Sequence, residues 1–551
     1  MFGWLKEQFA SKPKPGSRGY ARTILAQSFE AYKLARRDRP SEHFQPHGYS
    51  GDSAIIGSHD LMHRRTRDLI RNTAQGKRII SSLVDLVVGT GMQTYAWPFA
   101  PSEMLQIATE LESLQAGELG PRLTFALESD DLFEEWSTDP GQFDVEGRLS
   151  WPEVQRMLMA ESASVGNGLL VRSFRRNYSL VPLAYQIIER EQLDASQDRP
   201  ASKGKSRIVG GVELDGDNRT VAYHIYLDHP HDFFGIVQSG LQGVGAGLAA
   251  GSNRMRIPAE RVIDLAIFHR PSASLGVSWL DACGQSIWDR DSYMDSEIRS
   301  AAVDAVFAVA AYLNDVESQG PLGFADGLDD SDEHGNRTYK VGHSPVAATF
   351  ASDERFEMIR QTRPNAEAHS FIKLLDRDIA AASGVSYYTT TGDYEGTNFS
   401  STRGAKLDED LHIKPLQHWF ATHAALRVRK DFNAMAAAGG LFQSLSPAEF
   451  RRSRRTYQRF DAIGNGRELL DPFKEGEART TRLRTGLSTY KEECARTGKH
   501  WIRVLMQIAL ERKVTTMFGV TLDFSKSGAS ETEDKEDKEE PAEEKDTSNA
   551  A

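Results

Sequence analysis

The sequence predicts a helix-rich α+β protein. Two long segments carry apolar residues every three or four positions, and an insert rich in Gly, Asp and Pro separates them. Short segments with the alternating pattern of β-strands precede the first long helix and recur in the insert. Because a chain of 551 residues exceeds one ordinary hydrophobic core, we expect two to four structural units.

The first predicted helix covers residues 60–88. Leu69, Ile80 and Val84 recur at helical spacing in this segment, and it stops at Gly-Thr-Gly, which is a helix-ending signal. Residues 1–39 are basic and dotted with Pro and Gly, so we expect an extended N-terminal arm.

A capping box and a hairpin follow. Ser150-Trp-Pro-Glu153 has the form of a capping box and predicts a helix over residues 151–165. The alternating segments 207–214 and 220–226 flank the turn residues Asp-Gly-Asp-Asn, which predicts a β-hairpin.

The longest predicted helix covers residues 280–313, uninterrupted by proline, and would be roughly 50 Å long. Residues 314–364 change character: β-like pieces alternate with Gly, Asp and Pro, which predicts a small β or α/β insert. A second helix is expected over residues 365–383, ending at Gly384.

The C-terminal part is expected to be mostly helical. A third helix is predicted from Ser400 to Ala438, with a kink at Pro415 inside it. Ser446-Pro-Ala-Glu449 predicts the capped start of another helix, and we expect helix for most of the remainder up to Arg512.

The negative charge of the chain is concentrated at its C-terminus. Residues 531–546 hold ten acidic residues against three lysines, a net charge of −7, so the rest of the chain carries −5 of the total of −12. This tail has no apolar anchor, and we expect residues 521–551 to be disordered. Cys283 and Cys494 lie far apart in the sequence, which favours two free thiols over a disulfide.

No motif for catalysis, a cofactor or a metal stands out. Gly204-Lys205-Ser206 lacks the first glycine of a phosphate-binding loop, and no G-x-S-x-G or H-E-x-x-H motif occurs. A cluster of possible metal ligands matches no closed site, so a solvated loop is the favoured interpretation; it comprises His224, Asp228, His229, His231 and Asp232. No segment approaches eighteen consecutive apolar residues, so no stable membrane association is expected.

Several segments in order along residues 20–500 are similar to one known family. The most specific is "IAAASGVSYYTTTGDYEGTNFSSTR": a helix end, a Gly-Val turn, then Asp-Tyr, Thr-Asn, Ser-Ser and Arg. Others are "LMHRRTRDLIRNTAQGKRIISSLVDLVVGTG", "RIPAERVIDLAIFHRPSASLGVSWLDA" and "LLDPFKEGEARTTRLRTGLST". The chain resembles the lambda-type family of tailed-bacteriophage portal proteins.

The resemblance implies a portal-type fold, assembled as a ring, with a wing, a two-helix stem, a clip and a crown. Before the stem would come the arm (residues 1–39) and the wing (40–279). The stem would consist of helices 280–313 and 365–383, with the clip (314–364) between them. After it would follow a tunnel loop (384–401), a kinked tunnel helix (402–445) that also completes the wing, the crown (446–520) and the tail (521–551).

The resemblance also implies a function without catalysis or cofactor. The ring, of twelve copies, would stand at one capsid vertex of the virion after assembly in the host cytoplasm. It would conduct double-stranded DNA during packaging, retention and ejection. Its partners would be the terminase large subunit, the major capsid and scaffolding proteins, and head–tail adaptor or tail proteins.

The tunnel loop is the main candidate site. Its polar groups suit weak, exchangeable contacts to sliding DNA, and Asp393 and Glu395 would keep the duplex centred by repulsion. The candidate channel residues are Tyr387, Tyr388, Thr389, Thr390, Thr391, Asp393, Tyr394, Glu395, Asn398 and Ser400. A plain linker, with its tyrosines packed on a neighbouring wing, is the alternative for this segment.

Two smaller sets of candidate site residues each have two possible roles. Lys373 and Arg377 lie four apart and would either face DNA or form salt bridges with Asp376, Asp378 or acids of a neighbour. The clip acids would either dock a basic partner or line a solvated loop; they are Asp329, Asp330, Asp332 and Glu333.

Two other functions compete with the portal. A DNA- or nucleotide-processing enzyme would use the Gly-rich loop 235–252 and the His-rich cluster. A head–tail adaptor is disfavoured because adaptors are generally much shorter and lack two long helices around an insert.

Overall fold

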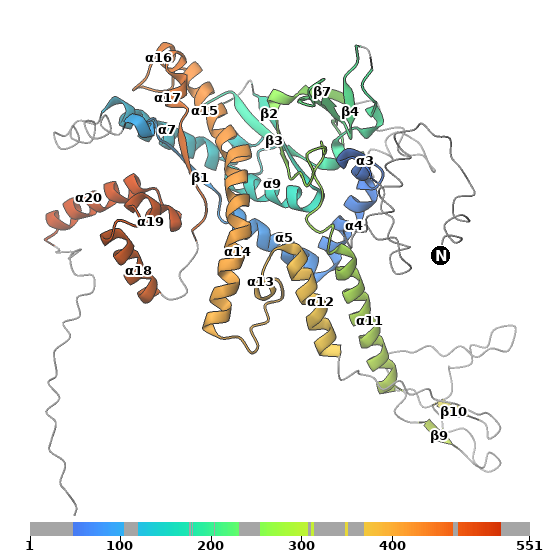
Figure 1. Ribbon diagram of the computed structural model, residues 1–551. Helices are drawn as coiled ribbons and strands as arrows, with labels where there is room; N and C mark the ends of the chain where they lie inside the picture. Colours follow the sequence, from blue (N-terminus) through green and yellow to red (C-terminus); the bar gives the residue numbers. More distant parts are fainter. Residues whose placement is uncertain are drawn as a thin grey trace, which may run out of the picture.

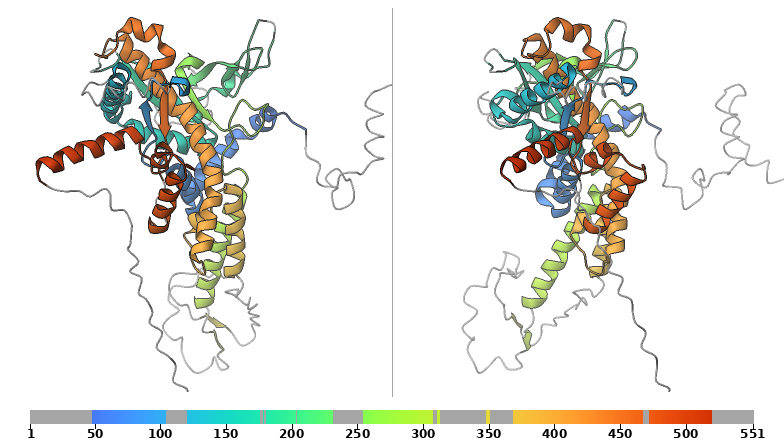
Figure 2. Two further views of the ribbon diagram at one scale, coloured as in Figure 1. Left: turned by 60° about the vertical axis from the view of Figure 1, so that its left-hand side comes forward. Right: turned by 90° about the vertical axis from the view of Figure 1, so that its left-hand side faces the viewer.

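The computed structural model describes residues 48–103, 120–175, 178, 180–202, 204–230, 254–306, 310–312, 348–350, 368–466 and 472–519. Figure 1 shows a body of small sheets and helices, from which α11 (Gly284–Val306) and α12 (Ala368–Ser383) extend downward. Both views of Figure 2 show α20 (Trp501–Met517) pointing outward from this body. The protein is therefore a helix-rich α+β protein, as the sequence predicts.

The remaining helices belong to the body and to the C-terminal part. They are α3 (Gly51–Ile56), α4 (His59–Asn72), α5 (Ala74–Val87), α7 (Pro121–Thr138), α8 (Pro140–Phe143), α9 (Trp151–Val165), α13 (Tyr387–Thr391), α14 (Phe399–Phe420), α15 (Leu426–Ala438), α16 (Pro447–Arg452), α17 (Arg454–Tyr457), α18 (Pro472–Arg484) and α19 (Tyr490–Arg496).

The predicted helix over residues 60–88 is two helices, so the prediction of one was wrong. Thr73 has an extended backbone, with φ −113° and ψ 138°. Its hydroxyl donates to the Leu69 carbonyl oxygen at 2.7 Å and accepts from the Gly76 N–H at 3.1 Å. Thr73 therefore ends α4 and caps α5, which a helical apolar pattern alone does not reveal.

Helix α9 confirms both its predicted bounds and its capping box. The backbone N–H and the hydroxyl of Ser150 donate to the Glu153 carboxylate at 2.8 and 2.7 Å. The helix ends at Gly166, whose φ is +89°. A Cβ at Gly166 would lie 2.3 Å from the Gly276 carbonyl carbon, so the junction with the next strand requires glycine here.

Three antiparallel sheets lie in the body. The first has the order β3-β2-β8 and the second β4-β5-β6-β7, while β1 pairs with β11. Their strands are β1 (Gln93–Ala96), β2 (Asn167–Phe174), β3 (Leu183–Ile188), β4 (Arg207–Val209), β5 (Val212–Leu214), β6 (Thr220–Tyr226), β7 (Arg254–Pro258), β8 (Val262–Ala266) and β11 (Phe460–Ile463).

The predicted hairpin is present, but its first arm is itself a hairpin. Strands β5 and β6 pair antiparallel across the expected turn. Gly210 and Gly211, with φ values of +53° and +81°, turn the chain between β4 and β5. Two adjacent residues with positive φ make a tight hairpin turn, which the prediction of one continuous strand missed.

The helices and sheets of the body enclose two clusters of buried apolar residues. The larger cluster joins α5, α7, α9, β2, α14 and α15, and Trp136, Phe143 and Phe432 lie at its centre. The smaller cluster lies on the four-stranded sheet and includes Val209, Ile225 and Ile257. The described part of the body thus buries its apolar side chains in two separate clusters.

The first long helix is shorter than predicted. Helix α11 begins at Gly284 and ends at Val306, and Ala310–Tyr312 form strand β9, which pairs in parallel with β10 (Ala348–Phe350). Strand β10 lies within residues 314–364, where β-like pieces are predicted. The prediction of helix was therefore wrong for residues 310–312, because a short apolar segment fits either structure.

Helices α11 and α12 contact each other, and the Asp376 side chain links both of them to the body. Asp376 of α12 is buried and accepts from the Arg290 guanidinium of α11 at 2.6 Å, and it also bonds the Gln75 amide of α5. The Trp279 indole N–H donates to the Ser383 carbonyl at 2.6 Å, joining the start of one helix to the end of the other. Helix α12 ends at Ser383, as predicted, before Gly384 with φ +65°.

The third long helix runs through residues 399–438, close to its predicted span. Pro415 lies inside α14, and residues 421–425 between α14 and α15 form a π-helical segment. A kink at Pro415 stays a prediction; the irregular backbone hydrogen bonding lies six residues or more beyond it.

The C-terminal part confirms the Ser446 cap and corrects the helix expected after it. The Ser446 hydroxyl accepts from the Glu449 N–H at 3.2 Å. Strand β11 then interrupts the helices, because its residues 460–463 pair with β1, more than 360 positions earlier in the chain. Local sequence carries no information about so distant a strand partner.

Several predictions lie outside the described residues: the arm 1–39, most of the insert 314–364, the Gly-rich loop 235–252 and the tail 521–551. The acids Asp329, Asp330, Asp332 and Glu333 are among them. Cys283 and Cys494 are buried and free. Within the described ranges, no helix has the length and apolarity that crossing a bilayer requires.

Candidate functional site

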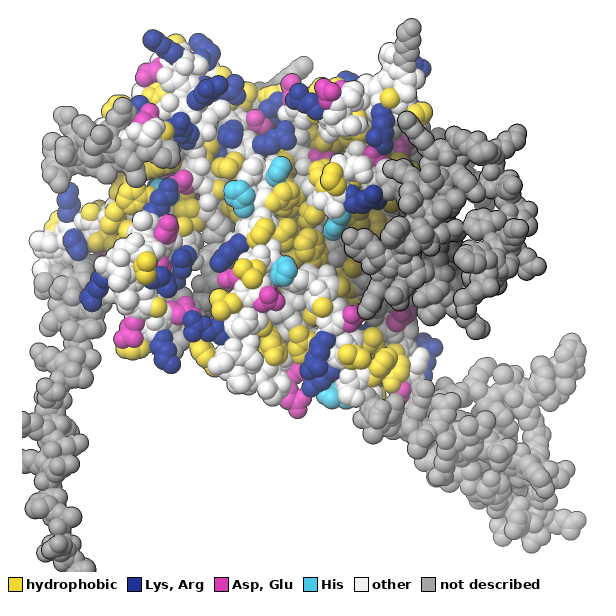
Figure 3. Space-filling view, viewed as in Figure 1, with side chains coloured by type: hydrophobic (Ala, Val, Ile, Leu, Met, Phe, Trp, Pro, Cys, Tyr) yellow, Lys and Arg dark blue, Asp and Glu magenta, His cyan; other side chains and the backbone are white. Residues whose placement is uncertain are grey.

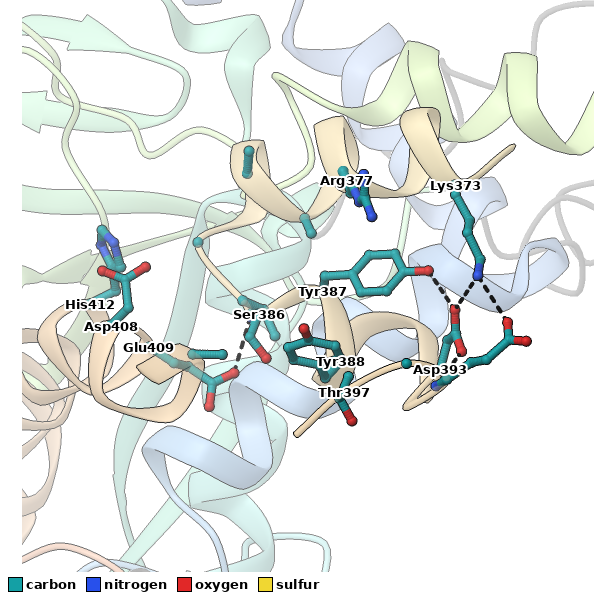
Figure 4. Close-up of a pocket in the computed structure, with 17 residues that line it drawn as sticks. Lys373, Arg377, Ser386, Tyr387, Tyr388, Asp393, Thr397, Asp408, Glu409 and His412 are labelled. Atoms are coloured by element: carbon teal, nitrogen blue, oxygen red, sulfur yellow. Dashed lines mark hydrogen bonds and ion pairs between the residues drawn. The ribbon is translucent and has the colours of Figure 1, made fainter. Parts of the chain in front are cut away.

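The predicted tunnel loop borders a polar pocket between α12, α13 and α14. Its volume is about 450 Å³, and its lining includes Lys373, Arg377 and Tyr387 at one end and Asp408, Glu409 and His412 at the other. Figure 4 shows these two groups on opposite sides of Ser386 and Tyr388.

The segment predicted as a loop, residues 384–401, contains helical structure. Residues 387–391 form the short helix α13, and the Ser386 hydroxyl caps it by accepting from the Thr389 N–H at 3.2 Å. The Ser386 N–H in turn donates to the buried Glu409 carboxylate of α14 at 3.2 Å. Sequence reasoning missed Ser386, although a serine three residues before Thr389 is a helix-start signal.

Asp393 is the centre of a hydrogen-bond cluster. Its carboxylate accepts from the Tyr387 hydroxyl at 2.8 Å and from the Glu395 N–H at 3.0 Å, and the Lys373 ammonium lies 3.5 Å away. The Glu395 N–H, the Tyr387 hydroxyl and Lys373 together lower the pKa of Asp393. The carboxylate is therefore held in its ionised form.

Lys373 forms ion pairs with Asp393 and Glu395 of the predicted tunnel loop. The two predicted roles, facing DNA or bridging to Asp376, Asp378 or a neighbour's acid, do not include these partners. Its ammonium donates to Glu395 at 3.1 Å, and the hydrogen bond to Glu395 and the nearby Asp393 raise the pKa of Lys373. A salt bridge was one prediction, but Asp376, named there as a partner, pairs with Arg290 instead. Lys373 thus compensates, within the subunit, one of the two negative charges that were expected to repel DNA.

The aromatic residues of the segment pack on one another and on Arg377. The guanidinium of Arg377 lies 5.9 Å from the centroid of the Tyr387 ring. Tyr388 stacks on Tyr394, with ring centroids 5.9 Å apart and an interplanar angle of 13°. These contacts give the segment a defined conformation in the isolated subunit.

The threonines turn inward toward the body. Thr390 is buried, and its hydroxyl donates to the Ser386 carbonyl at 2.9 Å, while the Thr391 hydroxyl donates to the Tyr387 carbonyl at 2.8 Å. The Thr389 carbonyl accepts from the Arg78 guanidinium of α5 at 3.0 Å. Arg78 lies over 300 positions away in sequence, so no sequence signal connected it to this site.

Only four of the ten predicted channel residues have exposed side chains in this structure. They are Tyr394, Glu395, Asn398 and Ser400. Asn398 caps α14 by accepting from the Ser401 N–H at 2.8 Å. The structure thus brings Tyr387, Asp393 and Lys373 together, and leaves the tip of the segment as its accessible part.

In the described part of the alternative metal cluster, two histidines lie beside carboxylates. His224 lies 3.2 Å from the Glu213 carboxylate and His229 lies 2.9 Å from that of Glu189. In the part of the chain that the structure describes, no three His, Cys, Asp or Glu side chains gather as metal ligands would.

Comparison with known families defines the class of this protein. The family described as "Phage portal protein, lambda family" matches residues 37–417, more than half of the chain. The chain therefore belongs to the lambda family of phage portal proteins, in agreement with the resemblance seen in its sequence.

Two relatives match over most of their length. The "Probable portal protein" of Halomonas phage phiHAP-1 is 25% identical over 518 residues, 93% of this chain and 92% of the relative. "Portal protein B" of Escherichia phage lambda is 21% identical over 485 residues, 84% of this chain and 85% of the relative.

A solved structure with lower similarity is the neck of a native GTA particle with C12 symmetry. It is 12% identical, with 79% of this chain and 94% of that chain covered, and its TM-score is 0.34. A TM-score this low supports no conclusion about fold or assembly.

Proposed function

We propose that this phage portal protein forms the ring-shaped conduit through which double-stranded DNA enters, stays in and leaves the capsid. Membership of the lambda portal family is the observation that carries the proposal. The ring would have twelve copies and stand at one vertex of the virion, after assembly in the host cytoplasm.

Helices α11 and α12 are the two stem helices in this proposal. Both helices extend downward from the body in Figure 1. The proposed clip, residues 314–364, would lie between them in the chain. Large apolar side chains on these helices are exposed in the single chain, including Trp288, Ile298 and Leu374 at 52%, 61% and 62%. Contact with the stem helices of adjacent copies would bury them.

Exposed apolar side chains continue beside the stem. Leu407 and Leu411 of α14 are 59% and 71% exposed. Figure 3 shows apolar side chains on the lower front of the molecule, where α11, α12 and α14 lie in Figure 1. A ring interface along these helices would remove this apolar surface from water.

The segment Gly384–Ser401 is the tunnel loop in this proposal. Its accessible tip combines Tyr394, Glu395, Asn398 and Ser400, which offer weak polar contacts to passing phosphates. In this proposal the wing, crown and clip have the ranges predicted from the sequence. The acids of the clip would dock a basic partner. The partners would be the terminase large subunit, the major capsid and scaffolding proteins, and the adaptor or tail proteins.

Imaging of the purified protein tests this function. We expect negative-stain or cryogenic electron microscopy to show rings with a central hole wide enough for a DNA duplex. Phage that lack the gene should regain packaged heads when this chain is supplied. Monomers without a pore, together with heads that fill normally in its absence, would rule out the conduit.

The tunnel loop has its own test within that function. Replacing Tyr394 and Ser400 by alanine should leave rings intact and impair DNA packaging or retention. Alanine substitution of Tyr178, an exposed tyrosine of the body, is the control. Loss of ring assembly in the loop variant would show that the segment is a structural linker.

A further inference from the structure

The end of the pocket that borders α12 has two basic side chains on one face of that helix. Lys373 and Arg377 lie one helical turn apart and both line the pocket. Figure 4 shows the two side chains beside the Tyr387 ring, on the side away from Asp408 and His412. Two adjacent cations over an exposed tip are the chemistry that recognises a phosphodiester backbone.

Two carboxylates compensate Lys373, but the structure holds them differently. Asp393 is fixed by the Tyr387 hydroxyl and the Glu395 N–H as well as by Lys373, and its side chain is 29% exposed. The Glu395 side chain is 76% exposed, and among the described residues its carboxylate contacts only Lys373.

This difference decides which of the two carboxylates a DNA phosphate can displace from Lys373. An exposed ion pair contributes little stability, because water and salt screen it and ordering two long side chains costs entropy. A DNA phosphate that contacts a lysine also releases condensed counterions, which favours the exchange at moderate salt. Displacing Asp393 would instead break the hydrogen bonds that shape the segment.

We propose that Lys373 and Arg377 form a phosphate-binding pair for double-stranded DNA, and that Glu395 occupies Lys373 as a displaceable internal counter-ion. The inference rests on the proposed channel function and names the groups that contact the duplex there. Each phosphate must compete with Glu395 for Lys373, while Asp393 stays in place. The contact is therefore weak and reforms readily as DNA slides.

The competition also limits adhesion in the ring. Twelve free lysines at one level would grip a polyanion strongly and with a steep dependence on salt. A carboxylate of the same subunit beside each lysine lowers the affinity for DNA, while the lysine keeps its positive charge. Arg377, whose guanidinium lies over the Tyr387 ring, forms no ion pair with another described residue and adds a second contact without exchange.

The test compares Glu395→Gln with the wild type in assembled rings. Binding of a short fluorescent DNA duplex is measured by anisotropy between about 50 and 200 mM salt. We expect Glu395→Gln to bind roughly two- to fivefold more tightly at the lower salt concentration. The slope of log K against log salt should steepen by about one for each Lys373 that gains a phosphate.

Two further variants make the result specific. Asp408→Asn removes the same charge from the far end of the pocket, and its carboxylate has no contact with Lys373 among the described residues. It should leave the slope near that of the wild type. Lys373→Met combined with Glu395→Gln should lose the gain in affinity and slope.

Equal effects of Glu395→Gln and Asp408→Asn would overturn the inference, since they would show a general charge effect. A gain that survives Lys373→Met would overturn it as well. If wild-type rings package DNA in either case, the conduit function stands and only this contact fails. If the wild type forms no ring, both fail.

Discussion

At the residue scale, the body contains an arginine that is wholly buried. Arg429 of α15 is 0% exposed; its guanidinium donates to Asp130 of α7 at 2.7 Å and lies 4.3 Å from the Phe133 ring centroid. Burial lowers the pKa of Arg429 to about 10, against the opposing effect of Asp130. Asp130 also accepts from the Ala96 N–H at 2.8 Å and lies 3.4 Å from Arg503 of α20, so one carboxylate joins three distant segments.

Removing that carboxylate should destabilise the body strongly. Asp130→Asn leaves the buried guanidinium without its counter-charge, which we expect to cost about 3–5 kcal/mol. Asp131→Asn is the matched control, because Asp131 is 69% exposed and its carboxylate lies 3.3 Å from the half-exposed Arg503 guanidinium. Denaturant unfolding of the two variants measures the difference; similar losses would mean that Asp130 does not compensate Arg429.

The capping carboxylate of α9 predicts a dependence of stability on pH. Hydrogen bonds from the Ser150 hydroxyl and N–H lower the pKa of Glu153 below its usual value of 4.5. A carboxyl group with a lowered folded pKa stabilises the protein above its unfolded pKa, and this contribution is lost as pH falls through the folded value.

Glu153→Gln should therefore differ from the wild type at neutral pH and converge with it in acid. We expect the wild type to be about 0.3–1 kcal/mol more stable at neutral pH, because a carboxylate at a helix N-terminus is favoured. The difference should shrink once the pH falls below 4.5. Thermal unfolding across this range measures it, and a difference independent of pH would contradict the assignment.

At the scale of elements, side chains decide where the helices are divided. Thr73 separates α4 from α5, and Ser386 and Asn398 start the helices α13 and α14 on either side of the exposed tip. Each is a short polar side chain that satisfies backbone N–H groups otherwise left without partners. The helix ends that surround the candidate site are thus built by local hydrogen bonds.

Loss of the Thr73 hydroxyl should weaken this division. Thr73→Ala removes both its bond to the Leu69 carbonyl and its cap on the Gly76 N–H, and we expect a cost of about 1 kcal/mol. Thr73→Ser keeps the hydroxyl and should cost less. Urea unfolding compares the two, and equal losses would assign the effect to the buried methyl group instead.

At the scale of the whole molecule, the single chain leaves apolar helix surface uncovered at one end. The far half of α11 and the outer faces of α12 and α14 carry the exposed residues Ile298, Leu374 and Leu411. Helix α20 also projects from the body, as both views of Figure 2 show. In the proposed ring, contact with neighbouring copies would cover this apolar surface.

A charge placed on the far half of α11 should block assembly without unfolding the subunit. Ile298→Asp, at a side chain that is 61% exposed, should reduce rings to smaller species and leave thermal unfolding of the subunit nearly unchanged. Ser296→Asp adds the same charge to an exposed position on the same helix and is the control. Mass measurement by light scattering distinguishes them, and intact rings with Ile298→Asp would place the interface elsewhere.

The sequence alone determined the features that depend on near neighbours in the chain. The helix-rich class, the bounds of α9, the end of α12 at Gly384 and the caps at Ser150 and Ser446 follow from apolar spacing and capping residues. The ordered series of family segments also identified the portal class, which the family comparison confirms.

Only the tertiary structure decided what depends on distant neighbours. The pairing of β11 with β1, the contact of Arg78 with Thr389 and the ion pair of Lys373 with Glu395 join positions that no local pattern connects. Whether a polar residue in the segment 384–401 is free or bound depends on which side chains the fold brings beside it. The spacing of apolar residues indicates which face of one helix or strand is buried. Which side chains of other elements a residue contacts depends on how those elements pack together.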